Sequence, residues 1–483
     1  MEQLSTKIMS KGVSKVKVLQ FGEGNFLRAF VDWIIQKMNQ RGVFDGHVCV
    51  VQPMPMGRVL DLEKQDGLYT LYLQGLDKGV ASKTHEVIDV LDDFINPYTQ
   101  YDKYLEYAES EDLEIVISNT TEAGIALDKE DLDYTSCPRS FPGKLLAFLY
   151  HRYTYFLGRR DRGLCIIPCE LIDNNGDELH RILKELATLK GYEDDFISWL
   201  DEANHYTSTL VDRIVPGYPR DEIEDIRKEL GYEDTSLVKG EIFHLWVLKK
   251  EPYIEERFPC HKANLNVIYA DSIKPYKERK VKILNGTHTA IVPVSYLYGI
   301  DTVRETIENE HLGRFAREFI FDEVIPTIDL PRDEMNDFAN SVLERYLNPY
   351  VRHELMSIAL NSISKYKARI LKTVHDYIKR KDNLPSHALF SLAATINFYE
   401  GKRGNEDIAL NDDPSYLETF KKLYEKYHQD HNATYLVHEV LKDTSMWGED
   451  LTLITGLEDK VLSYFEAQRE LGMKKALIAF LGD

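Results

Sequence analysis

The sequence predicts an α/β domain with a mainly parallel sheet, followed by an all-α domain. Three observations support this fold class. Short β-branched runs alternate with helix-period segments in the first part of the chain, the strand pattern stops near residue 272, and neither an internal repeat nor a low-complexity linker separates the two parts. We therefore expect residues 1–271 to form the first domain and residues 272–483 to form the second.

The strands of the first domain are expected where short apolar runs are rich in β-branched residues. Four of these runs are apolar enough to be covered on both faces, as in a parallel sheet: residues 16–21, 48–52, 113–118 and 164–168. Residues 67–75 are expected to add a strand, and late strands are expected at residues 244–248 and 265–270. Helix-period apolar residues predict helices over residues 101–108 and 144–155.

Beyond residue 272, nearly every segment has the apolar spacing of an α-helix. The expected helices are residues 302–324, 332–346, 350–379, 386–399, 414–427, 434–443 and 458–481. This change of pattern is the reason for placing the domain boundary there.

The charge balance disfavours whole classes of partner. The 59 basic and 80 acidic residues give a net charge of −21, which repels nucleic-acid phosphates and anionic lipid surfaces. No run of about 18 apolar residues is present, so we expect no membrane span. The first residues contain no apolar export segment, and the five cysteines are sparse and odd in number, which together predict reduced thiols in a cytoplasmic protein. The oligomeric state stays open.

Two glycines stand at the end of the first strand and directly before an amphipathic helix. The segment Gly22-Glu23-Gly24-Asn25-Phe26 predicts a turn whose backbone N–H groups approach the pyrophosphate of a dinucleotide. Leu27 stands where the GxGxxG pattern has its third glycine, so a tight turn without a ligand is the alternative.

The second strand ends at Gln52 instead of the acid that accepts a ribose hydroxyl of NAD. Gln52 can still bond a ribose hydroxyl, whereas Arg58 would favour the 2′-phosphate of NADP or simply lie in solvent. Local chemistry therefore leaves the choice between NAD and NADP open.

The most distinctive segment lies at the domain junction and contains Lys280, Asn285 and His288. At about 100° per residue these side chains fall at about 0°, 140° and 80°, so one side of a helix can present all three. Asn285 and Gly286 disfavour a helix interior, and such violations of local propensity concentrate at functional sites. The alternative is that Asn285 and Gly286 end one helix and Thr287 begins another.

These three residue types suit hydride transfer between a secondary alcohol and nicotinamide. Lys280 would accept the hydroxyl proton as the general base, and the neutral side chains of Asn285 and His288 would donate hydrogen bonds to the developing alkoxide. No metal is expected, because His288 has no His, Glu or Cys partner at the spacing of a metal-binding motif.

Together, both segments resemble the long-chain mannitol dehydrogenase family, the polyol-specific dehydrogenases. The family pattern GxGxFxRA is present from Gly22 to Ala29, and the more specific pattern KxxxxNxxH is present from Lys280 to His288. Further matches are Thr121-Glu122-Ala123-Gly124, Val211-Asp212-Arg213-Ile214 and Arg345-Tyr346-Leu347-Asn348-Pro349. The resemblance covers essentially the whole chain.

The resemblance implies a Rossmann-like first domain that binds NAD and a helical second domain that carries the chemistry. The implied cofactor contacts are Gly22, Glu23, Gly24, Asn25, Phe26 and Gln52, and the implied catalytic residues are Lys280, Asn285 and His288. Asp212 and Lys365 are implied substrate contacts, whereas Tyr276, Asn348 and Glu122 are expected to support the site or to pack.

The sequence departs from mannitol dehydrogenases at positions that touch the substrate in that family. Leu171 follows Glu170 where those enzymes have Asn, and Ser357 and Leu360 stand where they have Arg and His. Residues 274–282 form a local group of cations suited to a carboxylate, and we expect one or two of them to contact it: Lys274, Lys277, Arg279, Lys280 and Lys282. The expected small-molecule substrate is therefore a keto sugar acid.

A non-catalytic dinucleotide-sensing protein is the alternative from another functional class. Such a sensor needs the glycine turn but no base. The presence of Lys280, Asn285 and His288 together therefore favours an enzyme.

Overall fold

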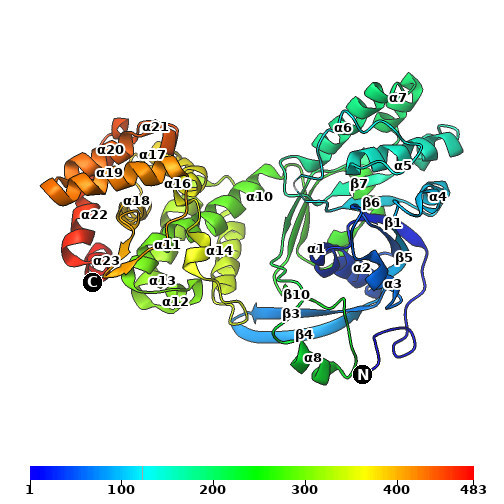
Figure 1. Ribbon diagram of the computed structural model, residues 1–483, viewed down its shortest axis with the longest axis horizontal. Helices are drawn as coiled ribbons and strands as arrows, with labels where there is room; N and C mark the ends of the chain where they lie inside the picture. The colour runs from blue at the N-terminus through cyan, green and yellow to red at the C-terminus, as the bar shows by residue number, and fades with distance from the viewer. Residues whose placement is uncertain (122, 483) are drawn as a thin grey trace. The chain divides into compact units, whose positions relative to one another are not determined.

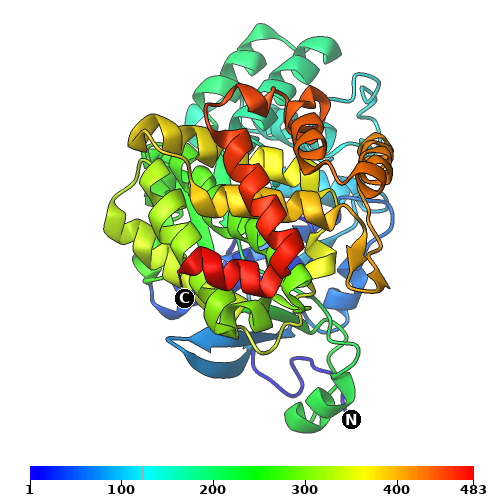
Figure 2. The ribbon, with the colours of Figure 1, turned by 90° about the vertical axis from the view of Figure 1, so that its left-hand side faces the viewer.

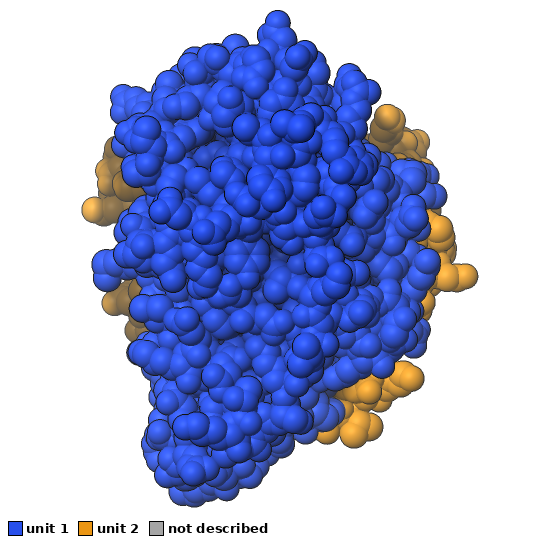
Figure 3. All heavy atoms as spheres, turned by 90° about the vertical axis from the view of Figure 1, so that its right-hand side faces the viewer, with its two compact units in different colours: residues 1–75, 82–273 blue, residues 76–81, 274–483 orange. Residues whose placement is uncertain are grey.

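The structure is a computed structural model that describes residues 1–121 and 123–482. It divides by packing into two units, which Figure 3 shows in different colours. The first unit comprises Met1–Gly75 and Ser82–Ile273. The second comprises Lys274–Asp483 together with Leu76–Ala81, the tip of a hairpin that no sequence pattern assigns to it.

The first unit is built on a six-stranded sheet in the order β5-β2-β1-β6-β7-β8, and all of its strand pairs are parallel. Its strands are β1 (Val16–Phe21), β2 (His47–Val51), β5 (Leu91–Ile95), β6 (Ile115–Ser118), β7 (Cys165–Pro168) and β8 (His205–Tyr206). The strand order reverses between β1 and β6, which is where such sheets bind dinucleotides. The predicted α/β class and four of its strands are confirmed.

Alternate side chains of this sheet enter two separate cores. Val18 and Val50 pack on the side of α2 (Val31–Gln40), whereas Leu19 and Phe21 pack on the side of α5 (Phe141–Tyr155) and α6 (Asn175–Lys190). Figure 1 shows these helices on opposite sides of the sheet. Burial on both faces explains why the central strands are continuous apolar runs in the sequence.

Two small sheets complete the strands of this unit. One has the order β10-β3-β4 and the other β12-β11-β9. Their strands are β3 (Tyr69–Asp77), β4 (Val80–Ile88), β10 (Val238–Glu241), β9 (Thr209–Asp212), β11 (Leu245–Lys249) and β12 (Val267–Ala270). The sequence pattern predicted β3, β11 and β12 but missed β4, which is largely exposed and polar, and β5, β9 and β10, whose short sequences contain charged residues.

The remaining helical segments of the first unit are short. They are α1 (Asn25–Ala29), α3 (Val59–Glu63), α4 (Tyr101–Glu106), α7 (Asp194–Glu202), α8 (Ile223–Leu230) and α9 (Pro252–Arg257), with 3-10 turns at Tyr107–Glu109, Arg160–Arg162 and Cys260–Ala263. The free cysteines Cys49, Cys165, Cys169 and Cys260 are buried in this unit.

The second unit is almost entirely helical, and Figure 2 shows its helices facing the viewer. Its longer helices are α11 (Gly286–Tyr298), α13 (Glu310–Glu318), α14 (Arg332–Tyr346), α17 (Lys372–Lys381), α18 (Ser386–Phe398), α19 (Pro414–Asp430), α20 (Ala433–Lys442), α22 (Leu457–Leu471) and α23 (Met473–Leu481). Its shorter ones are α10 (Lys274–Arg279), α12 (Val303–Glu308), α15 (Leu355–Ile358), α16 (Ser362–Tyr366) and α21 (Thr444–Trp447), with π-helices η4 (Lys280–Asn285), η5 (Phe319–Val324) and η7 (Lys367–Leu371) and 3-10 turns η6 (Ile325–Thr327) and η8 (Leu451–Leu453).

Three predicted helices are broken by local backbone geometry. The helix expected over residues 302–324 restarts at Asn309, whose side chain caps α13. The one expected over residues 350–379 is interrupted at Asn361, with φ of 54°, and the last one breaks at Gly472, with φ of 77°. The prediction of no strands in this part was also wrong, because Lys402–Arg403 and Glu406–Asp407 form a two-stranded hairpin. None of the described helices combines the length and the apolar character that a membrane crossing requires.

Candidate active site

The glycine turn leaves β1 at the carboxyl edge of the main sheet. Gly22 has φ of 123°, and a Cβ there would lie 3.0 Å from the carbonyl oxygen of Asn119, which follows β6. Only glycine fits such a conformation and approach without strain. Gly24 begins α1 with ordinary φ and is exposed, and a Cβ on it would meet no atom within 4 Å.

The side chain of Arg28 stabilises this turn through hydrogen bonds. Its buried guanidinium donates to the carbonyl of Glu23 at 3.1 Å, to the side chain of Asn25 at 2.7 Å, and to the carbonyl of Ser236. Phe26 stacks on Phe30 with ring centroids 5.0 Å apart. Asn25 and Phe26 are thus held by the protein itself. Arg28 belongs to the GxGxFxRA pattern, but this structural role was not predicted for it.

Gln52 and Arg58, the two residues that bear on the choice between NAD and NADP, have hydrogen-bond partners within the protein. Gln52 is buried, and its amide donates to the carbonyls of Met54 and Pro55 at 2.8 and 3.2 Å. Arg58 is exposed, with Nε 3.2 Å from Asp61 and Nη2 3.1 Å from the carbonyl of Thr235. The backbone N–H of Arg58 also donates to the Glu23 carboxylate at 3.1 Å. The residues after β2 therefore brace the glycine turn.

A cavity of about 230 Å³ lies at the same edge, lined by Pro53 and Met54 after β2 and by Thr120 after β6. Glu170, which is buried directly after β7, forms hydrogen bonds with residues at this edge of the sheet. Its carboxylate accepts from the Thr120 N–H and hydroxyl, both at 2.9 Å, and from the Ser118 hydroxyl at 3.0 Å. Burial raises the pKa of Glu170. The sequence signal for this role is an acid directly after a buried strand, but no role was predicted for Glu170.

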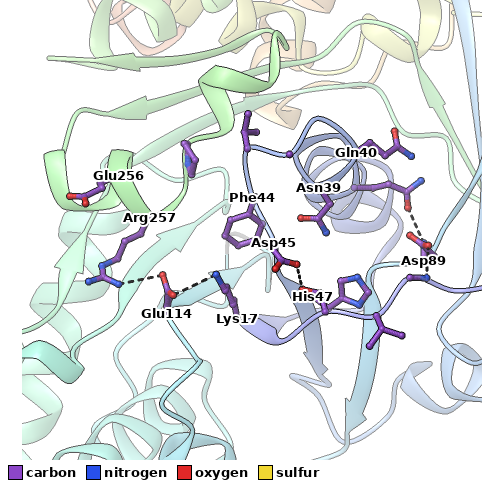
Figure 4. Close-up of a pocket in the computed structure, with 17 residues that line it drawn as sticks. Lys17, Asn39, Gln40, Phe44, Asp45, His47, Asp89, Glu114, Glu256 and Arg257 are labelled. Carbon is purple, nitrogen blue, oxygen red and sulfur yellow. Dashed lines mark hydrogen bonds and ion pairs between the residues drawn. The ribbon is translucent and has the colours of Figure 1, made fainter.

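A larger cavity of about 830 Å³ opens at the opposite edge of the sheet. Lys17 near the start of β1 and His47 at the start of β2 line it, together with Glu114 just before β6. Figure 4 shows Glu114 between Lys17 and Arg257, with N–O distances of 3.8 and 3.3 Å. This polar cavity lies at the amino ends of the strands and is therefore separate from the glycine turn.

In the second unit, Lys280, Asn285 and His288 lie on one uninterrupted helix. It runs through α10, η4 and α11, and both Asn285 and Gly286 have right-handed helical φ and ψ. The alternative of a helix end at Asn285 and Gly286 is therefore wrong. Because a π-helix bonds residue i to residue i+5, Lys280 and Asn285 are one turn apart on the same side. His288 follows Asn285 at the i+3 position of the α-helix.

His288 is enclosed by rings and cations. Its ring centroid lies 4.3 Å from that of Tyr346 and 4.9 Å from that of His353. Burial lowers the pKa of His288 well below its usual range, and the neighbouring His353, Arg345, Arg369 and Lys365 lower it further. The ring is therefore neutral at pH 7. Its Nε2 atom is buried and has no hydrogen-bond partner among the described residues.

Two of the expected carboxylate-binding cations are paired inside the protein. Arg279 is buried and lies 2.7 Å from Glu334. Lys282 is buried, with Nζ 2.7 Å from Asp376 and 3.0 Å from the Thr327 hydroxyl. Only one or two of the five cations were expected to contact a carboxylate, and Arg279 and Lys282 are poor candidates, because each side chain points into the helical packing and neutralises an acid there.

The remaining predicted residues have varied surroundings. Asp212 is buried at the end of β9, and the neighbouring Arg213 donates to the carbonyls of Phe243 and Ile242 at 3.1 and 3.2 Å. Lys365 is half-buried in α16 and donates to the carbonyl of Ile358 at 2.7 Å.

Three residues were expected to support the site or to pack. The ring of Tyr276 lies 5.0 Å from the Arg279 guanidinium, and Asn348 is buried and accepts a hydrogen bond from the Tyr350 N–H. Glu122 lies outside the described residues. Residues 1–121 and 123–482 contain no group of three His, Cys, Asp or Glu side chains placed to hold a metal ion.

Comparison with solved structures supports the architecture. The chain is similar to a D-sorbitol dehydrogenase in substrate-free form, with a TM-score of 0.81 and 20% identity, covering 98% of this chain and 100% of that one. It is also similar to the Pseudomonas fluorescens mannitol 2-dehydrogenase in ternary complex with NAD and D-mannitol, with a TM-score of 0.66 and 20% identity over 97% of this chain and 95% of that one. At this identity these likenesses show the fold.

Sequence comparison extends over the whole chain. The altronate oxidoreductase of Bacillus subtilis (strain 168) is 43% identical over 95% of this chain and 94% of its own. That of Phocaeicola vulgatus is 43% identical over 100% of both chains. The Mannitol dehydrogenase Rossmann domain matches residues 16–262, and the Mannitol dehydrogenase C-terminal domain matches residues 272–467. The chain therefore belongs to the mannitol dehydrogenase family.

Proposed function

We propose that this protein reduces the keto sugar acid D-tagaturonate to D-altronate with NADH and catalyses the reverse oxidation with NAD. As a member of its family, the chain is an oxidoreductase that acts on a CH–OH group with NAD as the cofactor. Relatives named altronate oxidoreductase share 43% identity with it over nearly the full length. The stretches SNTTEAGI, IIPCELIDNNGD and IKPYKERKVKILNGTHTA also resemble tagaturonate reductase, which is another name for altronate oxidoreductase.

The carboxyl edge of the main sheet fits a dinucleotide. Gly22 keeps the turn tight against Asn119, and the exposed Gly24 leaves open space where a Cβ would stand, which suits the close approach of a pyrophosphate. We assign cofactor contacts to Gly22, Glu23, Gly24, Asn25 and Phe26, and to Gln52 through its carboxamide oxygen. NADH, when bound, supplies the hydride.

The arrangement of Lys280, Asn285 and His288 is the observation that carries the proposal. The buried Nε2 of neutral His288 has no protein partner, and Asn285 precedes it on the same helix. Both side chains donate to the carbonyl oxygen of the substrate and hold it as negative charge develops. Lys280, one π-turn before Asn285, gives a proton to that oxygen during reduction and takes it back during oxidation. Asp212 and Lys365 are assigned to substrate hydroxyl groups, following the family resemblance.

NADH oxidation by the purified protein tests this function. Tagaturonate should be the best substrate, ahead of fructuronate, and fructose should be turned over poorly. A preference for fructuronate would instead identify a fructuronate reductase of the same family. NADH binding without turnover of any of these compounds would identify a dinucleotide-sensing protein.

The variant Lys280→Ala tests the mechanism. It should lose about 10²- to 10⁴-fold in kcat, because general acid–base catalysis contributes that much, and should bind NADH as wild type does. A small primary amine should restore part of the activity by replacing the lost amino group. Activity close to that of wild type, or a loss that no amine restores, contradicts the assignment of Lys280.

A further inference from the structure

Two cationic side chains and a histidine stand around His288 on segments that are not part of its own helix. Lys365 lies on α16, Arg369 on the π-helix η7, and His353 just before α15. All three segments belong to the second unit, and α11 packs against α15, α16 and η7.

The contacts between η7 and α11 are close and specific. Arg369 donates from Nη1 to the hydroxyl of Thr289 at 3.2 Å, and Thr289 is the residue next to His288. A Cβ on Gly286 would lie 3.4 Å from the carbonyl oxygen of Arg369, so the two backbones meet there. The Arg369 side chain therefore starts at the helix that carries the catalytic residues and reaches along it.

The two cations, Lys365 and Arg369, are not neutralised by carboxylates of the described residues. Arg369 and Lys365 are half-buried, yet neither forms an ion pair with any described carboxylate, and their hydrogen bonds go to the Thr289 hydroxyl and the Ile358 carbonyl. Asp412 is an acid whose charge opposes the lowering of the Lys365 pKa by burial. Its carboxylate, however, accepts hydrogen bonds from the Tyr399 hydroxyl and the Ile363 N–H. Half-buried charges without a counterion are costly, and a bound anion removes that cost.

The electrostatics of the region agree with this geometry. Burial lowers the pKa of Arg369, and burial together with Arg369 lowers the pKa of Lys365. Burial keeps His288 neutral, and Arg369 and Lys365 add to this effect. The contrast with Arg279 and Lys282 is direct, because each of those side chains has a carboxylate at 2.7 Å.

We propose that Arg369, with Lys365 one turn before it, binds the carboxylate of the sugar acid and so selects it over a neutral ketose. Thr289 holds Nη1, which leaves the rest of the guanidinium fork for a carboxylate. Lys365 adds a second charge while its proposed hydroxyl contact is kept. This inference rests on the proposed function, since it names the group that gives the site its substrate class.

Kinetics of Arg369→Gln test the inference. The variant should lose roughly 10- to 150-fold in kcat/KM for tagaturonate, mostly through KM, while kcat/KM for fructose stays unchanged. Lys367→Gln is the matched control, because it removes one charge from an exposed position of the same π-helix and should behave as wild type. An equal loss for the acid and for fructose, or no loss for the acid, overturns the proposal.

Titration of D-altronate into the protein saturated with NADH separates this inference from the proposed function. Because both ligands are in the reduced form, binding is measured without turnover, and it decides the role of Arg369 even if the wild type reduces no keto acid. Weaker binding in Arg369→Gln, with Lys367→Gln unchanged, supports the role; equal binding, or no binding by the wild type, rejects it. If the Gln variant does not fold, Arg369→Lys must still weaken binding, because it keeps the charge but loses the fork, and unchanged binding in that variant rejects the role.

Discussion

Asp32, on α2 after the glycine turn, is a buried carboxyl group with a shifted pKa. Burial raises its pKa from 3.8 to about 7, although Gln20, Tyr69 and Arg28 oppose the rise. The Tyr69 hydroxyl lies 2.7 Å from the carbonyl oxygen of Arg28 and 3.2 Å from the Asp32 carboxyl, but it has one proton to donate. A protonated Asp32 donates to Tyr69 and leaves the Tyr69 proton for the Arg28 carbonyl.

The variant Asp32→Asn should change how stability depends on pH. Because the folded state keeps a proton on Asp32 that the unfolded state releases above pH 3.8, the contribution of Asp32 to the free energy of unfolding falls as pH rises from 3.8 to about 7, by on the order of 4 kcal/mol. Asparagine mimics the neutral acid and cannot ionise, so the variant should lack this contribution, and its stability relative to the wild type should rise over this window. Urea unfolding at several pH values measures both profiles, and parallel profiles would contradict the assignment.

At the scale of elements, the turn between β1 and α1 contains two glycines with different expected roles. Gly22 is required by the backbone conformation, and Gly24 is expected to face the cofactor. Gly22→Ala should destabilise the protein by about 1–3 kcal/mol, because φ of 123° and the Asn119 carbonyl at 3.0 Å both exclude a Cβ. Gly24→Ala should keep the wild-type Tm, since its Cβ enters open space, but should raise the Kd for NADH. Thermal unfolding and NADH titration measure the two effects. Unchanged NADH affinity in Gly24→Ala would remove the turn from the cofactor site.

The elements also show where local patterns suffice. The central strands were predicted well because burial on both faces makes them apolar runs. The helix expected over residues 350–379 failed because its breaks depend on single residues, such as Asn361 with φ of 54°, whose side chains do not disturb the apolar spacing. The π-helix η4 was not predicted, because its wider turn leaves no mark on hydrophobic periodicity over six residues.

At the scale of the whole molecule, two charge effects on an anionic substrate oppose each other. The net charge of −21 repels the substrate, whereas the local cations Lys365 and Arg369 attract it. Salt screens interactions beyond ~8 Å at physiological ionic strength, so the long-range repulsion is already weak there. We therefore expect added salt to raise the KM for tagaturonate by weakening the contact with Arg369 and Lys365. The KM for fructose, which has no charge, should stay constant. A KM for the acid that falls with salt would mean that the far field dominates.

The sequence by itself determined the fold class, the family, and the residue types at the candidate site. These depend on local information: apolar periodicity, the glycine turn after the first strand, and the spacing of Lys280, Asn285 and His288 along one helix. The comparisons confirm the family, and the structure confirms the predicted α/β and helical parts.

Only the tertiary structure decided which charges are available to a ligand. Arg279 and Lys282 looked suitable because they are near Lys280 in the chain, yet they pair with Glu334 and Asp376. Arg369 lies far from His288 in the sequence but meets its helix at Thr289, and it pairs with no carboxylate of residues 1–121 and 123–482. The physical reason is that the cost of a charge depends on the groups packed around it, and those groups come from distant parts of the chain that only folding brings together.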